Sequence, residues 1–176
     1  MKQAEIAGGT LTAPNEQPSV GRRLNDIELA SVLGPNIALS DYRGRANLVL
    51  IAADDGGPTA ALVERIARQY AQIKNEDAVA LLILQDSPEA ARRKAQDWKA
   101  PYPVLIDEDG RVHRELGATG AGKTGTAVYI TDRFGEVFGV YRTRDGTTLP
   151  SYEEIVHMLE FVNSQCPECD APEWPA

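Results

Sequence analysis

Hydrophobic residues in this 176-residue chain form short continuous runs and spaced stripes, and the two patterns alternate along the sequence. The runs at 48–52 and 79–84 predict strands that are buried on both faces of a sheet. Each run is followed by apolar residues at helical spacing, behind Pro58 in the first case and behind Ser87 in the second. The pattern therefore predicts two successive strand–helix units.

Shorter hydrophobic segments extend the predicted sheet. Residues 27–33 and 37–39 predict an N-terminal β-hairpin, because the Gly-Pro-Asn sequence at 34–36 is a turn signal. Three further runs predict the remaining strands, at 104–106, 127–131 and 137–141. A last helix is predicted behind Ser151. Together these elements predict an α/β fold with a central mixed β-sheet flanked by helices.

The two ends of the chain differ in composition from its middle. Residues 1–20 are polar and interrupted by proline, which predicts a flexible N-terminal arm. Residues 21–164 carry the strands and helices of one domain, and residues 165–176 form a proline-rich tail that contains both cysteines. The chain is 43% hydrophobic, enough for a core that needs no disulfide bonds.

The charge balance excludes some classes of partner. The chain has 18 basic and 26 acidic residues and a formal net charge of −8. This charge disfavours binding to nucleic acid and to anionic lipid surfaces. No apolar stretch resembles a signal peptide or a membrane-spanning helix, so we predict a cytoplasmic protein without membrane insertion.

Three phrases of the sequence carry a family resemblance. They are IALSDYRGRANLVL at 37–50, VLIDEDGRV at 104–112 and AVYITDRFGEV at 127–137. These phrases resemble the alkyl hydroperoxide reductase/thiol-specific antioxidant (AhpC/TSA) family, the peroxiredoxin-like redoxins. The resemblance covers residues 20–163 and implies a thioredoxin-like fold for the domain at 21–164, with the N-terminal β-hairpin as its entry.

The resemblance also locates the family's active-site turn, directly behind the strand at 48–52. Thioredoxin-like relatives have Cys-Gly-Pro-Cys or a similar phrase there, and this sequence has Gly56, Gly57, Pro58 and Thr59. A thiol at a helix N-terminus is stabilised as the thiolate by the helix dipole, and neither glycine nor threonine can replace it. A peroxiredoxin would also carry an arginine where this chain has Thr126. We therefore expect no peroxide reduction at this turn.

Two carboxylates, Asp54 and Asp55, stand immediately before the turn. Their negative charge disfavours a thiolate or a bound anion beside them. We expect them to cap the following helix by accepting hydrogen bonds from its free N–H groups, and not to form a catalytic pair.

The segment from Gly117 to Thr124 matches the phosphate-binding pattern GxxxxGK[ST], with Lys123 as its lysine. That motif functions between a buried strand and the N-terminus of a helix. Here a short amphipathic segment precedes the pattern and the strand at 127–131 follows it. We therefore expect a glycine-rich surface loop and no nucleotide binding.

The only cysteines, Cys166 and Cys169, form a Cys-Pro-Glu-Cys phrase after the last helix. The spacing permits a local disulfide and hence a redox-responsive pair. It also supplies half of a zinc site, which His113, His157 or a second subunit would have to complete. A third interpretation is a reduced pair packed beside Trp174. These three interpretations stay open.

The sequence thus predicts a peroxiredoxin-like or thioredoxin-like protein without the peroxidatic cysteine, which binds a protein partner or associates with itself and needs no cofactor. The alternative is a thiol-disulfide oxidoreductase or antioxidant protein that acts through Cys166 and Cys169. A further alternative is a zinc-stabilised homodimer.

Overall fold

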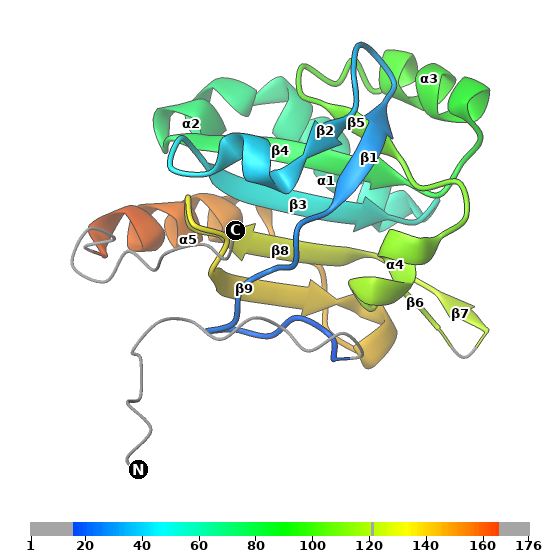
Figure 1. Ribbon diagram of the computed structural model, residues 1–176. Coiled ribbons are helices and arrows are strands. Elements are labelled where there is room, and N and C mark those ends of the chain that lie inside the picture. The colour runs from blue at the N-terminus through cyan, green and yellow to red at the C-terminus, as the bar shows by residue number, and fades with distance from the viewer. Residues whose placement is uncertain (1–15, 121, 166–176) are drawn as a thin grey trace.

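A seven-stranded sheet forms the centre of the protein in the computed structural model, which describes residues 16–120 and 122–165 (Figure 1). The strand order is β2-β1-β5-β4-β3-β8-β9. The strands are β1 (Glu28–Ser31), β2 (Ile37–Ala38), β3 (Asn47–Ala53), β4 (Ala78–Leu84), β5 (Val104–Ile106), β8 (Ala127–Thr131) and β9 (Val137–Arg142). Strands β3, β4 and β5 are parallel and the other pairings are antiparallel, so the sheet is mixed, as predicted.

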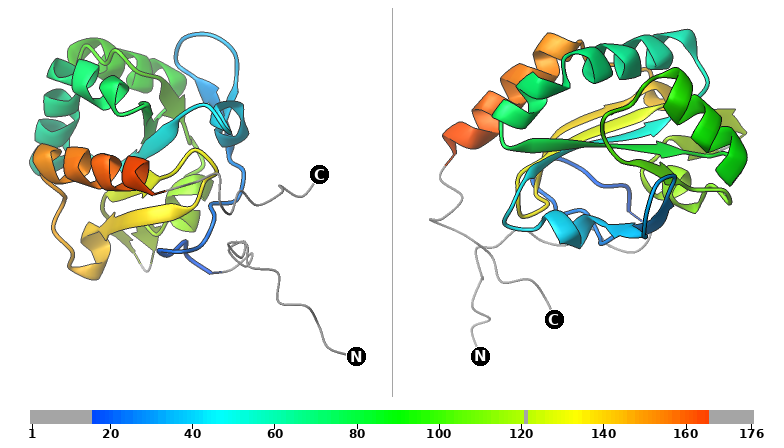
Figure 2. Two further views of the ribbon diagram at one scale, coloured as in Figure 1. Left: turned by 90° about the vertical axis from the view of Figure 1, so that its left-hand side faces the viewer. Right: turned by 90° about the horizontal axis from the view of Figure 1, so that it is seen from above.

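Helices cover both faces of this sheet (Figure 2). One face packs against α1 (Gly57–Arg68), α2 (Tyr70–Asn75), α3 (Pro88–Asp97) and α5 (Tyr152–Ser164). The other face packs against α4 (Arg111–Glu115), the 3-10 helix η1 (Leu39–Tyr42) and the segment before β1. A second 3-10 helix, η2 (Thr143–Asp145), follows β9, and β6 (Thr119–Gly120) pairs with β7 (Lys123–Thr124) in a separate small hairpin.

The central strands separate two hydrophobic clusters. In β3 all seven residues are buried, and alternate side chains enter opposite clusters. Val49 and Ile51 face the layer of α1 and α5, whereas Leu48 and Leu50 face the layer of α4. A strand covered on both faces needs apolar residues at every position, which explains the unbroken run in the sequence.

The N-terminal hairpin of β1 and β2 is confirmed, as is the start of α5 behind Ser151. The first predicted helix, however, is two helices, because the chain leaves helical geometry at Gln69. The hydroxyl of Tyr152 donates to the carbonyl of Gln69 at 2.9 Å, so a residue of α5 holds this carbonyl. The apolar stripe continues across the break, and its spacing alone did not indicate it.

The described residues modify the predicted ends of the domain. Pro18 is buried and its carbonyl accepts a hydrogen bond from Arg142, so packing begins within the predicted arm at 1–20. Residues 1–15 and the tail at 166–176, with both cysteines, lie outside the described residues. Within 16–120 and 122–165, no helix combines the length and the apolar character that crossing a bilayer requires.

Candidate functional site

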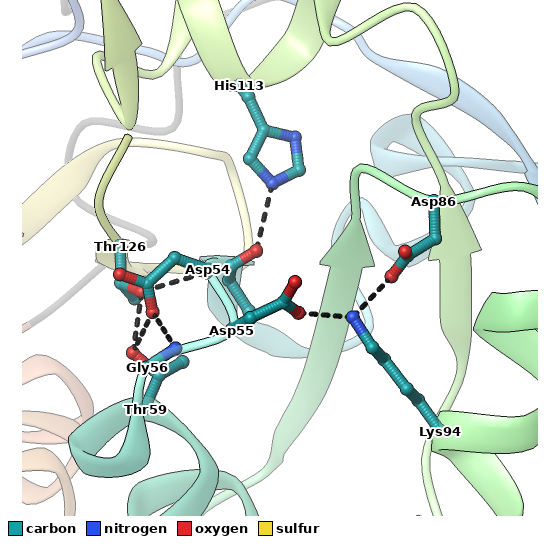
Figure 3. Close-up of polar contacts among 9 residues, drawn as sticks. Asp54, Asp55, Gly56, Thr59, Asp86, Lys94, His113 and Thr126 are labelled. Carbon is teal, nitrogen blue, oxygen red and sulfur yellow. Dashed lines mark hydrogen bonds and ion pairs between the residues drawn. The ribbon is translucent and has the colours of Figure 1, made fainter. Parts of the chain in front are cut away.

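Aspartates follow all three parallel strands at their carboxyl ends. Asp54 and Asp55 follow β3, Asp86 comes two residues after β4, and Asp107 directly follows β5. Because parallel strands end at the same edge of a sheet, these carboxylates lie along one edge, with Asp54 and Asp55 directly before the start of α1. Thr126 reaches the same edge, since it precedes β8, which runs antiparallel to β3. We take this edge as the candidate site (Figure 3).

A closed ring of hydrogen bonds joins Asp54, Thr59 and Thr126. The Asp54 N–H donates to Thr126 Oγ1 at 3.0 Å, the two threonine hydroxyl oxygens lie 2.7 Å apart, and the Thr59 hydroxyl donates to Asp54 Oδ1 at 2.6 Å. An ionised carboxylate only accepts, so the single proton of Thr59 points to Asp54 and Thr126 donates to Thr59. The bonds therefore run in one direction around the ring, an arrangement in which each bond strengthens the next.

The ring fixes the charge of Asp54 and encloses its partners. Burial by itself would raise the pKa of Asp54, but the hydrogen bonds that the Thr59 hydroxyl and the Gly56 N–H donate to its carboxylate lower this pKa below its ordinary value. Thr59 is only 2% exposed and Thr126 is 0% exposed. A hydroxyl that donates to a carboxylate resembles an activated nucleophile, but no substrate atom reaches either hydroxyl in this arrangement.

The aspartates do not cap α1 as the sequence suggested. The N-cap residue is Gly56, and no side chain caps the helix. Asp54 Oδ1 accepts from the N–H of Gly56 itself at 3.0 Å, before the first helical turn, and Asp55 points away from the helix to Lys94. The physical reason is that both carboxylates have stronger partners, a buried hydroxyl in one case and a cation in the other.

Lys94 of α3 joins the loops after β3 and β4. Its ammonium group contacts Asp55 and lies 2.7 Å from the carboxylate of Asp86 (Figure 3). Burial would lower the pKa of Lys94, but the hydrogen bonds that its ammonium group donates to both carboxylates raise this pKa above its ordinary value. Lys94 thus carries a positive charge that two carboxylates already neutralise.

His113 and Asp107 form a buried pair behind the site. His113 Nδ1 lies 2.7 Å from Asp107 Oδ2, and His113 Nε2 lies 3.3 Å from the carbonyl oxygen of Ala53. Both neighbours only accept hydrogen bonds, so each of these two contacts needs a proton on the ring nitrogen that makes it. Burial would raise the pKa of Asp107, but the His113 ring and the N–H groups of His113 and Val112 lower it. The pair connects α4 to the last residue of β3.

This pairing bears on the predicted zinc site, for which His113 and His157 were candidate ligands. Both ring nitrogens of His113 face acceptors within the domain, and the side chain is 1% exposed. His157 lies on the exposed face of α5, as expected. Among the described residues no group of three or more histidine, cysteine, aspartate or glutamate side chains is arranged to hold a metal ion. A zinc site would have to be built around Cys166 and Cys169, outside the described residues.

The glycine-rich segment from Gly117 to Thr124 lacks the surroundings of a phosphate-binding loop. The short helix α4 precedes it, and the β6–β7 hairpin passes into β8 with no helix between them. The expected surface loop is thus partly a hairpin, because Thr119 pairs with Thr124. No helix N-terminus is available to complete a phosphate site here.

The helix that leads to the cysteines is anchored at the far end of β3. Asn163 of α5 accepts a 2.7 Å hydrogen bond from Asn47, the first residue of β3, whereas the candidate site follows the last residue of that strand. A strand rises about 3.3 Å per residue, so about 20 Å separate the two ends of β3. The structure therefore brings Asp54, Thr59 and Thr126 together and keeps the end of α5 away from them.

Curated relatives and solved structures are similar to this chain. Chloroplastic peroxiredoxin Q of Gentiana triflora is 25% identical over 135 residues, which are 74% of this chain and 60% of that protein. The peroxiredoxin Q of Suaeda salsa is 26% identical over 135 residues, 74% of this chain and 61% of that protein. The chain thus spans about 60% of the length of these curated relatives.

Solved structures establish the fold. Peroxidoxin BcpB from Mycobacterium tuberculosis has a TM-score of 0.70 and 18% identity, with 82% of this chain and 98% of that one covered. AhpC from Enterococcus faecalis has a TM-score of 0.67 and 19% identity, with 88% and 96% covered. The predicted thioredoxin-like fold is confirmed. The model of the AhpC/TSA family matches residues 20–140, more than half of the chain. The chain belongs to the AhpC/TSA family.

Proposed function

We propose that this protein is a redoxin that does not reduce peroxides at the turn of residues 54–59 and that its fold serves protein binding. The observation that carries the first part is the contact between Thr59 and Thr126, 2.7 Å between hydroxyl oxygens. The family resemblance puts Thr59 in the place of an active-site cysteine and Thr126 in the place of a peroxidase arginine. Two residues with those roles must be neighbours, so their contact supports the match.

The charges at the turn support the same proposal. A peroxidatic thiolate needs a nearby positive charge, and Lys94, a cation at this edge, is held between Asp55 and Asp86. Asp54 is ionised and hydrogen-bonded within the turn. A thiolate or a peroxide anion would meet uncompensated negative charge here.

Peroxide consumption by the full chain tests this part of the proposal. With hydrogen peroxide or an organic hydroperoxide and a dithiol reductant, we expect no turnover above the background of reductant alone. The Cys166→Ser/Cys169→Ser variant is measured beside it, so that chemistry at the tail is recognised. Robust turnover that survives this double replacement would contradict our interpretation of residues 54–59.

A groove on the side of the sheet where β2 and β1 lie supports the binding role. It has a volume of about 440 Å³ and lies between the β1–β2 hairpin and α3, with Tyr102 and Val104 among its lining residues. At its rim Leu33 is 80% exposed. In a two-fold interface the same surface of each chain contacts its copy, so an exposed apolar side chain beside an apolar groove lets each chain place Leu33 against the groove of the other. The partner we propose for this groove is a second copy of the chain.

Sedimentation velocity over a range of protein concentrations tests this association. We expect a dimer that dissociates on dilution and that Leu33→Asp weakens, because a carboxylate at the rim would be desolvated in the interface. Val20→Asp, at an exposed position near β9, is the matched control. A monomer at all concentrations, or equal weakening by both variants, contradicts an interface at this groove.

The Cys-Pro-Glu-Cys phrase favours a second candidate function, thiol-disulfide exchange through Cys166 and Cys169. Titration of free thiols with and without reductant, combined with metal analysis, separates the possible states. Two titratable thiols that disappear reversibly under mild oxidant support a redox pair. One zinc ion per two chains supports the zinc-stabilised homodimer, and two permanently free thiols contradict both.

A further inference from the structure

Three large hydrophobic side chains are exposed in the described part of the chain. They are Val20, Leu33 and Phe161, with 62%, 80% and 52% of their surface exposed. Leu33 belongs to the groove described above, at the edge of the sheet formed by β1 and β2. The other two lie beside β9, at the opposite edge, and need a separate explanation.

Phe161 of α5 packs against Phe138 of β9. The rings of Phe138 and Phe161 are 6.2 Å apart in an edge-to-face arrangement. Val20 lies in the segment before β1, which packs on the other face of the sheet and whose Gly21 N–H donates to the carbonyl of Val137 at 2.9 Å. We call Phe138 and Phe161 the apolar corner. It is formed by β9 and α5.

The tail of the chain leaves the domain at this corner. Phe161 lies in the last turn of α5, and its carbonyl accepts hydrogen bonds from the side chains of Ser164 and Gln165. Gln165, the last described residue, therefore lies about 6 Å from Phe161 along the helix axis, and the tail follows it directly. The tail at 166–176 has three acidic residues and no lysine or arginine, and its one large hydrophobic side chain is Trp174.

We propose that the tail at 166–176 folds back onto the apolar corner and that Trp174 packs against Phe138 and Phe161. Trp174 comes nine residues after Gln165, so an extended tail reaches up to about 30 Å, far more than the return to Phe161 requires. Pro172 and Pro175 beside Trp174 restrict the free tail, which lowers the entropy lost on docking. Indole and phenyl rings also gain from edge-to-face contacts.

Docking of this kind gives Cys166 and Cys169 a fixed place. The pair would be held next to the end of α5, which Asn163 ties to the start of β3. The cysteines would thus be kept apart from the turn of residues 54–59, at the other end of the same strand. The inference does not depend on the proposed function, because it concerns only the tail and the apolar corner.

Tryptophan fluorescence of the full chain tests the proposal. The chain has two tryptophans, Trp98 and Trp174, so Trp98→Phe leaves Trp174 as the single probe. We expect blue-shifted emission of Trp174 and weak quenching by acrylamide. Adding Phe161→Ser should shift the emission to longer wavelength and increase quenching, whereas adding Glu64→Ser, a control at an exposed position of α1, should change neither.

A second measurement covers the case in which Phe161→Ser disturbs α5. In the full chain, Trp174→Ser should accelerate hydrogen exchange of the amides at 159–165, since the tail no longer covers that turn, while exchange in β3 and β4 stays unchanged. If Trp174 in the Trp98→Phe protein emits at the wavelength of a solvent-exposed indole, the proposal is overturned. Shielding that disappears on dilution overturns it as well, because the occupant is then a second copy of the chain.

Discussion

Thr59 and Thr126 are 67 residues apart in the sequence, and their hydroxyl oxygens lie 2.7 Å apart. One stands in the first turn of α1 and the other directly before β8, on opposite sides of the end of β3. Asp54 binds both, through its carboxylate and through its N–H. The loop after β3 is thus held to the sheet by a polar contact where the family resemblance leads us to expect catalytic groups.

Removing one hydroxyl of this ring should destabilise the protein measurably. Thr126→Val keeps the shape of the buried side chain but leaves the Asp54 N–H without its acceptor. We expect a loss of about 1–3 kcal/mol in the free energy of unfolding, measured by urea denaturation. Thr147→Val, at an exposed position, should change it by less than about 0.5 kcal/mol. Equal effects in both variants would mean that the ring contributes no stability.

The buried pair of Asp107 and His113 predicts a dependence of stability on pH. The pKa of Asp107 in the folded protein lies below its ordinary value, so the unfolded chain binds more protons in acid. Its contribution to stability is complete above about pH 5 and is lost as the pH falls through the ordinary pKa of about 4 and then the folded pKa. The pKa of Asp54 is lowered too and acts in the same direction.

The Asp107→Asn variant isolates this contribution. Burial raises the pKa of Asp132 and Glu136, and these groups act in the opposite direction, so the slope of the variant must be compared with that of the wild type. Urea denaturation at pH 5 and pH 3 should show a smaller loss of unfolding free energy in Asp107→Asn. Asp97→Asn, at an exposed position on α3, should keep the wild-type slope. An unchanged slope in Asp107→Asn contradicts the role of the pair.

The glycine-rich segment predicts an absence of nucleotide binding despite its matching string. The backbone from Gly117 to Thr124 forms part of a hairpin, and no helix N-terminus follows it. Calorimetric titration of the full chain with ATP or GTP and Mg²⁺ should show no saturable heat. Saturable binding that is lost in Lys123→Ala would prove this prediction wrong.

The elements of the fold could be predicted because their causes are local. Unbroken apolar runs mark strands covered on both faces, and Ser151 with Glu154 forms the capping box that starts α5. The break at Gln69 was missed, since its carbonyl is held by Tyr152 from a distant helix. Nothing in the residues around Gln69 indicates that partner.

The candidate site was predicted only as a position along the chain. The ring at Thr59 depends on a residue 67 positions away, and the partner of Asp55 is Lys94 of α3. The sequence did indicate one role of Asp107. An aspartate after a buried strand and before a short helix commonly accepts hydrogen bonds from backbone N–H groups, as Asp107 does here from Val112. Its second partner, the ring of His113, could be recognised only once the structure showed that ring to be buried.

Restoring two cysteines tests whether residues 56–59 form the active-site turn of the family. Gly56 is the N-cap of α1 and Thr59 is its third residue, two positions whose side chains approach each other at a helix start. The backbone at Gly56, with φ of −70° and ψ of 147°, accepts any residue. A Cβ there would lie 3.0 Å from Asp54 Oδ1, so the carboxylate must move by a few tenths of an ångström.

We therefore expect Gly56→Cys/Thr59→Cys, in a background with Cys166→Ser and Cys169→Ser, to give a folded protein that forms a reversible disulfide. Because the Asp54 carboxylate stands beside the new thiols, the pKa of the more reactive one should lie above the ordinary thiol value of about 8.5. Adding Asp54→Asn should lower this pKa, measured by the pH dependence of alkylation.

The two-cysteine protein with Asp97→Asn in place of Asp54→Asn is the control, since Asp97 lies at the end of α3. A normally folded variant that never forms the bridge, even with strong oxidant, means that these residues do not occupy the redox turn, and the match of Thr59 to an active-site cysteine is then wrong.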